Sequence, residues 1–173
     1  WRKLATGAGL VRIDHFSEQT FVLVRDAIEA LESAHATGFV IDLRGNAGGS
    51  MLQAAECADL FLEEGTLLRT VGRGGRKVAN LQAYMEAEPQ GIEPDLPVVA
   101  LVDGGSASAS EILAGDLVLL DRAVIVGARS YGKGTVQKVY TLEDGGENGR
   151  GVLLKLTVAE YRLAGDTPVT EAG

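Results

Sequence analysis

Apolar residues along the chain follow two spacings, and the two alternate through most of the sequence. Short, nearly continuous apolar runs predict strands of the kind that is buried in parallel sheets. Such runs occupy residues 9–14, 39–43, 98–102 and 123–126, and a further strand is predicted at residues 66–71.

Helical spacing fills several of the intervals between these strands. Ser17 is the expected N-cap of a first helix, whose apolar residues recur every three or four positions. These residues are Phe21, Val24, Ile28 and Leu31. Two more helices are predicted, at residues 51–62 and 111–120. The alternation of strands and helices indicates an α/β fold with a largely parallel sheet flanked by helices.

The other segments have weaker or different patterns. Residues 135–142 and 152–161 are interpreted as an antiparallel strand pair joined by the turn at residues 143–149. Residues 72–94 are polar and contain scattered glycines, and only a short helix around residues 81–87 is predicted there. This segment is either a mobile surface element near a functional site or an ordinary long connection.

Composition narrows the class of protein. The 173-residue chain is 46% hydrophobic and 23% charged, which is typical of one soluble globular domain. Its net charge of −8 argues against nucleic-acid binding, which requires a basic face. Cys57 is the single cysteine, and its helical apolar surroundings favour a buried structural thiol. No apolar run reaches the length of a membrane span.

A serine-rich turn is the first candidate for chemistry. The strand at residues 98–102 is followed by Asp-Gly-Gly, then by a turn with three serines, and then by a helix. A strand, a sharp turn and a helix in this order is where α/β folds present nucleophiles, which makes Ser108 a candidate. The alternative is structural, because Ser108 and Glu111 also match the capping-box pattern of a helix N-terminus.

A serine nucleophile needs a base, and the best candidate is a lysine. The two histidines, His15 and His35, are interpreted as surface or packing residues. Lys133 lies between two glycines after a buried strand, and a lysine can act as base when burial lowers its pKa. Gln137, four residues on, would orient the amine without adding charge. The alternative for Lys133 is an ordinary solvated loop lysine.

Residues 127–133 also match most of a phosphate-binding loop. The next residue of such a loop is serine or threonine, but here it is Gly134, and no obvious helix follows. Nucleotide binding is therefore disfavoured.

Four sequence blocks carry a resemblance to a known family. They are DLRGNAGG at residues 42–49, ADLF at 58–61, GSASASEI at 105–112 and GKGTVQ at 132–137. In these blocks, and in their order from about residue 9 to residue 163, the chain resembles the carboxyl-terminal processing peptidases, or tail-specific proteases, of the S41 serine peptidase family. The resemblance implies a crotonase- or ClpP-like fold built of β-β-α units.

The resemblance also implies roles for individual residues. Ser108 would be the nucleophile, Lys133 the general base and Gln137 the residue that orients the lysine. Glu111 falls at a motif position with a supporting role that the sequence does not define.

An oxyanion hole is implied as well. It would use the backbone N–H of Ala109 and one N–H from the turn at Gly48 and Gly49. The residue after the nucleophile, at a helix start, has an N–H with no partner inside the helix.

By the same resemblance, the substrates would be proteins with unstructured, apolar C-termini, cleaved without a metal or cofactor. The family usually carries a PDZ domain upstream, and none fits in the eight residues before Gly9. We therefore expect residues 1–173 to be a single, truncated catalytic core, with any PDZ domain or adaptor outside it. The implied location is extracytoplasmic: periplasm, cell envelope or thylakoid lumen.

Two other classes of function remain open. One is a non-catalytic relative of this family that binds hydrophobic ligands, and the other is a crotonase-type acyl-CoA enzyme. The combined presence of Ser108, Lys133 and Gln137 argues against both, because neither function needs a serine–lysine pair.

Overall fold

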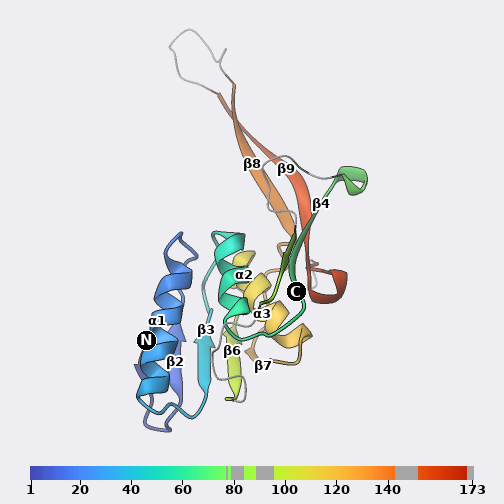
Figure 1. The fold of residues 1–173 in the computed structure, drawn as a ribbon. Helices are drawn as coiled ribbons and strands as arrows, with labels where there is room; N and C mark the ends of the chain where they lie inside the picture. The colour runs from blue at the N-terminus through green and yellow to red at the C-terminus, as the bar shows by residue number, and fades with distance from the viewer. Residues whose placement is uncertain (77, 79–83, 89–95, 143–151, 171–173) are drawn as a thin grey trace.

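The computed structural model describes residues 1–76, 78, 84–88, 96–142 and 152–170. Figure 1 shows two sheets, with the helices beside the first of them. The first sheet has the strand order β1-β2-β3-β6-β7, and all its pairings are parallel except that of β1 with β2. Its strands are β1 (Arg2–Lys3), β2 (Gly9–Arg12), β3 (Phe39–Asp42), β6 (Val98–Val102) and β7 (Ala123–Gly127).

Three helices pack on one face of this sheet. They are α1 (Thr20–Ser33), α2 (Met51–Asp59) and α3 (Ala109–Leu119). Val11, Ile41 and Ala100 are neighbours across β2, β3 and β6, and all three are buried in the core that the helices complete. The next row of the sheet points to the opposite face, where Val40 is half-buried and Val124 is exposed. Within the described residues, the helices therefore cover one face of the sheet.

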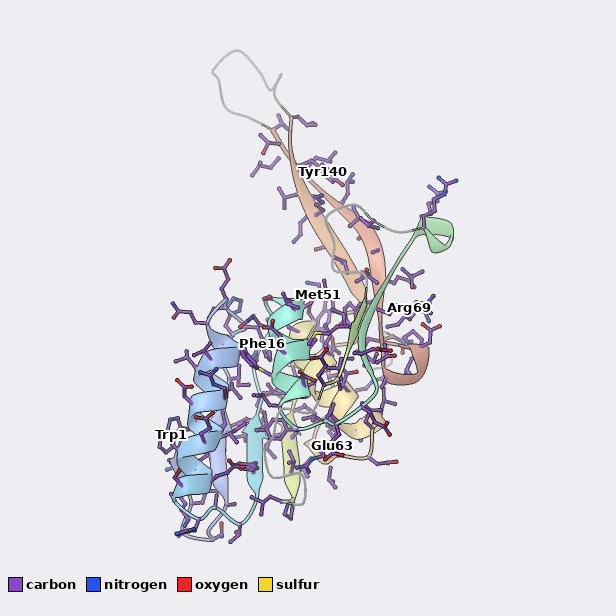
Figure 2. The ribbon with its side chains drawn as sticks, viewed as in Figure 1. Trp1, Phe16, Met51, Glu63, Arg69 and Tyr140 are labelled. Carbon is purple, nitrogen blue, oxygen red and sulfur yellow. The ribbon has the colours of Figure 1, made fainter. Side chains whose placement is uncertain are left out.

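The second sheet is antiparallel throughout. Its order is β10-β9-β4-β5, with β8 paired to β9. Its strands are β4 (Thr66–Gly72), β5 (Tyr84–Glu86), β8 (Thr135–Leu142), β9 (Val152–Leu163) and β10 (Thr167–Pro168), with 3-10 turns at Arg73–Gly75 and Ala164–Asp166. In Figure 1, β8 and β9 extend from the body of the molecule as a two-stranded ribbon. Figure 2 labels Tyr140 on this ribbon, well away from Glu63 in the body.

The helix that follows the serine turn lies inside the protein. Ile112, Leu113 and Leu117 of α3 are at most 1% exposed, and each such side chain contributes roughly 1.5–3 kcal/mol when removed from water. Asp116 is fully buried among them. One of its carboxylate oxygens accepts the Ala164 N–H at 3.1 Å, and the other has no partner among the described residues. Burial raises the pKa of Asp116 well above its usual value, so the neutral acid is favoured.

The fold class and the largely parallel sheet predicted from the sequence are confirmed, and so is the pairing of β8 with β9. The strand predicted at residues 66–71 belongs to the second sheet. The turn predicted at residues 143–149 lies outside the described residues.

Two local predictions were wrong. Ser17 is not the cap of α1; Gln19 occupies the N-cap position and makes no side-chain cap bond. The Ser17 N–H instead donates to the hydroxyl of Thr20, which closes the turn before the helix. The short helix expected around residues 81–87 is contradicted where the structure describes it, because Tyr84–Glu86 pairs with β4 as a strand. Residues 81–83 lie outside the described part.

The buried thiol was interpreted as structural, and its surroundings agree. Cys57 on α2 is fully buried in the core cluster, and desolvation raises the pKa of its thiol. In the described part of the chain, no helix is long and apolar enough to cross a membrane.

Candidate active site

Two glycine-containing turns meet at the carboxyl edge of the first sheet. One follows β3 and the other follows β6, and these strands are parallel neighbours, so their ends lie side by side. The turns are joined directly: the Ala107 N–H donates to the Asn46 carbonyl at 3.0 Å, and the Ser106 hydroxyl donates to the Leu43 carbonyl at 2.8 Å. The serine turn is thus fixed against the Gly48–Gly49 turn.

Asp42 is the last residue of β3, at the start of the first turn, and it forms ion pairs with two arginines. Its side chain is 4% exposed and is bound by the Arg44 guanidinium through both carboxylate oxygens, at 2.8 Å each. Arg12 adds a third contact at 3.2 Å. The hydrogen bond from Arg44 is the main cause that lowers the pKa of Asp42, so the carboxylate stays charged and holds the end of β3 at neutral pH.

Asn46 organises the same turn from inside. Its side chain is fully buried; Nδ2 donates to the Ile13 carbonyl and Oδ1 accepts the Gly48 N–H, both at 2.8 Å. The Asn46 carbonyl also accepts the Ser110 hydroxyl at 2.8 Å. Through its side chain and its carbonyl, this one buried residue therefore links the segment after β2, the glycine turn and the start of α3.

The three serines of the second turn differ in what their hydroxyls do. Ser106 and Ser110 are fully buried, and each hydroxyl donates to a backbone carbonyl of the first turn. Ser108 is half-buried and stands with Glu111 in a capping-box arrangement at the start of α3. Of the three, Ser108 is the one whose hydroxyl is not committed to holding the two turns together.

Ser108 also has an unusual backbone conformation. Its φ of 57° and ψ of −114° lie in a region that residues with a side chain rarely adopt, at a cost of about 1–3 kcal/mol. Hydrogen bonds offset that cost. The Ser108 N–H donates to Glu111 Oε2 at 2.7 Å, and the Ser108 carbonyl accepts the N–H groups of Glu111 and Ile112. Strain that surrounding contacts maintain in this way is characteristic of functional turns.

Glu111 connects the serine turn to the lysine turn. The carboxylate is 6% exposed, and its Oε2 accepts two backbone N–H groups, from Ser108 at 2.7 Å and from Lys133 at 2.9 Å. Its Oε1 accepts the Gly132 N–H and, at 2.7 Å, the Ser130 hydroxyl. The backbone nitrogens of Ser108 and Lys133 therefore bind the same oxygen atom, so the serine turn and the lysine turn are adjacent.

Lys133 and Gln137 line one surface pocket. The pocket is completed by Ala47 from the first glycine turn and Ala107 from the serine turn. Lys133 is half-buried, and within the described residues its amine forms no ion pair. His15 and His35 are exposed and do not line this pocket. The segment of residues 127–133 leads into strand β8, whereas a phosphate-binding loop leads into a helix.

The Gly48–Gly49 turn lies against Ser108. Gly48 has a φ of +108°, and a Cβ built there would be 2.8 Å from Ser108 Cβ and 3.1 Å from the Ala109 nitrogen. The Gly48 N–H donates to Asn46. Among the hydrogen bonds of the described residues, none uses the N–H of Gly49 or of Ala109. These two N–H groups therefore have no hydrogen-bond partner among the described residues.

We expect Gly48→Ala to lower activity strongly, because its new Cβ would occupy space beside Ser108 Cβ and require a positive φ. Gly45→Ala is the matched control: Gly45 has a φ of +73°, but a Cβ added there would meet no atom within 4 Å. Turnover and melting temperature should be measured together. A Gly48→Ala protein with wild-type turnover would contradict the prediction.

Four residues of the site carried little or no signal in the sequence analysis: Asn46, Asp103, Ser130 and Tyr161. Asp103 accepts the N–H groups of Gly45 and Gly105 at 2.9 Å each, and these bonds lower the pKa of Asp103. Asn46 and Asp103 both follow buried strands in turns, a position that favours such side chains. That position was a usable signal for these two residues. No group of three or more metal-binding side chains lies among the described residues.

Comparisons with known proteins identify relatives of this chain. The profile of peptidase family S41 matches residues 7–173. The carboxy-terminal-processing protease of Bartonella bacilliformis is 38% identical over 169 residues, which are 95% of this chain and 37% of that protein. The carboxyl-terminal-processing protease of Synechocystis sp. is 39% identical over 153 residues, 88% of this chain and 33% of that protein. The chain thus spans about a third of the length of these curated relatives.

Solved structures give the same result. The photosystem II D1 C-terminal processing protease superposes with a TM-score of 0.81 at 30% identity, covering 95% of this chain and 40% of that one. Mature CPAF superposes with a TM-score of 0.72 at 16% identity, covering 95% of this chain and 45% of that one, which shows the shared fold alone.

Proposed function

The chain belongs to peptidase family S41, and on that premise we propose that it hydrolyses peptide bonds with Ser108 as nucleophile and Lys133 as general base. One observation carries the proposal: a single oxygen of Glu111 binds the backbone N–H groups of both residues. These two hydrogen bonds hold the serine turn beside the lysine turn. Ser108 and Lys133, which are 25 residues apart in the sequence, therefore lie on neighbouring turns.

The proposed chemistry has two steps. The neutral Lys133 amine takes the proton of the Ser108 hydroxyl as Oγ attacks the carbonyl carbon of the substrate. The resulting ammonium returns the proton to the leaving amine, and the acyl group stays on Ser108. Water then attacks this ester and gives its proton to Lys133, and the ammonium passes that proton to Ser108 Oγ as the acid product leaves. Gln137, which shares the pocket with Lys133, orients the amine without adding charge.

The negative charge that develops on the substrate oxygen would be bound by backbone N–H groups. Ala109 supplies one, at the start of α3, where the helix leaves its N–H unpaired. We assign the second to Gly49, because the Gly48 N–H is already bound by Asn46. Gly48 contributes by having no side chain next to Ser108. Glu111 supports the site by positioning backbone groups and takes no part in proton transfer.

Protein substrates follow from the relatives, which are named carboxyl-terminal-processing proteases. We propose that residues 1–173 form a catalytic core that cleaves near exposed, unstructured C-terminal tails. Recognition of the tail, by a PDZ domain or an adaptor, would lie outside these residues. An extracytoplasmic location agrees with relatives such as the chloroplastic processing peptidase 2 of Arabidopsis thaliana. A non-catalytic, ligand-binding module is not favoured, because the relatives compared carry protease names.

The test combines cleavage with covalent labelling. The protein is incubated with an unstructured peptide that has an apolar C-terminus, and in parallel with the same peptide amidated at that end. A serine-reactive phosphonate should stop cleavage, and mass spectrometry should place the adduct on Ser108. A chelator should leave the rate unchanged. An adduct on another residue, or cleavage that persists after complete labelling, would overturn the assignment of Ser108.

A further inference from the structure

One buried tyrosine touches both halves of the proposed site. Tyr161 lies on β9 and is 1% exposed. Its hydroxyl donates to the Lys133 carbonyl in a short hydrogen bond and lies 3.3 Å from the Ser108 carbonyl. Its backbone N–H donates to the Gly134 carbonyl at 3.0 Å. A residue of the second sheet is thus bound to the lysine turn at two successive carbonyls.

Glu111 and Tyr161 both contact the backbone of Ser108 and of Lys133. The N–H groups of Ser108 and Lys133 share one carboxylate oxygen of Glu111, and the Tyr161 hydroxyl lies beside the carbonyls of the same two residues. The lysine turn needs such support, because Lys133 is flanked by glycines and Gly132 has a φ of +84°. Without the two side chains, little in the sequence would fix the lysine backbone.

The chemistry of the hydroxyl defines its role. A hydroxyl has one hydrogen, and the Ser108 carbonyl already accepts the N–H groups of Glu111 and Ile112, so the hydrogen belongs to the Lys133 carbonyl. Burial, followed by the nearby Glu111 and Asp116 carboxylates, raises the pKa of Tyr161. The phenol therefore stays protonated at working pH and acts as a donor. It neither accepts the serine proton nor reaches the pocket.

We propose that Tyr161 is a positioning residue that holds the Lys133 backbone next to Ser108, so that the lysine amine stays within reach of the serine hydroxyl. The inference rests on the proposed function, because it assigns Tyr161 a part in the same reaction. Positioning errors of a fraction of an ångström to an ångström reduce turnover much more than they reduce substrate binding. Removing the Tyr161 hydroxyl should therefore lower kcat more than it changes KM.

The test is Tyr161→Phe, which removes the hydroxyl and keeps the ring in the core. We expect kcat to fall about tenfold to a hundredfold with KM nearly unchanged. Ile28→Val controls for lost stability, since Ile28 is fully buried in α1, a helix that contributes no residue to either turn. Tyr140→Phe controls for loss of a phenol on the exposed ribbon. Both controls should keep wild-type kcat.

Amide hydrogen exchange separates this inference from the proposed function. In Tyr161→Phe the amides of Gly132 and Lys133 should exchange faster than in the wild type and in Ile28→Val. An unchanged kcat in an active protein, or unchanged exchange at these amides, overturns the role of Tyr161. If the wild type cleaves no peptide, the proposed function fails, and the exchange rates still decide whether Tyr161 holds the lysine turn.

Discussion

Replacing Ser108 with alanine is expected to abolish peptide cleavage, with a fall in kcat of roughly 10⁴-fold or more. The expected loss is large because no other serine hydroxyl of the turn is available: those of Ser106 and Ser110 are buried and bound to carbonyls. The fold should survive, since alanine removes one atom from a half-buried side chain and keeps the bond from the Ser108 N–H to Glu111. The measurement is turnover of one unstructured peptide, with melting temperature beside it.

Ser106→Ala and Ser110→Ala provide the comparison. Each removes one buried hydrogen bond, which costs about 0.5–1.5 kcal/mol of stability, because the Leu43 and Asn46 carbonyls each keep a backbone N–H donor. Both variants should melt earlier than Ser108→Ala and should still cleave at a measurable rate. Full activity in Ser108→Ala would refute the assignment of the nucleophile. Loss of activity in Ser106→Ala at a temperature where it is folded would point to that serine instead.

The elements around the site were predictable from the sequence because their causes are local. The apolar runs that became β3 and β6 are continuous, and each is followed at once by a glycine-containing turn. Parallel strands bring their carboxyl ends to one edge, so the meeting of the two turns follows from the strand pattern. Ser108 could be singled out because it stands where the second turn enters a helix.

The contacts that join the two halves of the site could not be predicted in this way. Tyr161 and Ser108 are 53 residues apart, and nothing in the alternation of β9 distinguishes this tyrosine from a plain core residue. Glu111 matched a capping box, and it does accept the Ser108 N–H, but its bonds to Gly132 and Lys133 depend on the tertiary fold. The local sequence pattern identified the proposed nucleophile and base, but it did not reveal the hydrogen bonds that hold their turns together.

The errors in the second sheet and at the first helix have different causes. Residues 84–86 have no strong period of their own and become a strand through pairing with β4. Ser17 has the chemistry of an N-cap, but the chain turns so that Thr20 accepts its N–H and the helix begins later. At residues 84–86 a contact with a distant strand outweighed the local preference, whereas at Ser17 one local hydrogen bond replaced another.

Replacing Lys133 with arginine should remove activity almost completely, although size and charge are nearly kept. A guanidinium does not give up its proton in proteins, so it cannot accept the proton of a serine. Lys133 forms no ion pair among the described residues, and we expect the variant to melt close to the wild type. Lys138→Arg is the matched control, because Lys138 lies on β8 over the ring of Tyr140, a contact that arginine also makes.

The pH dependence of the rate identifies the base independently. A lysine base and a histidine base predict different pH profiles, because the two kinds of side chain lose their protons in different pH ranges. A histidine base would level off near its usual pKa of about 6.5, and Lys133→His should recover only a trace of activity with that lower midpoint. If Lys133→Arg turned over near the wild-type rate, the base would be another residue. His15 and His35 would then be the remaining candidates, yet both are exposed and neither lines the pocket that holds Lys133 and Gln137.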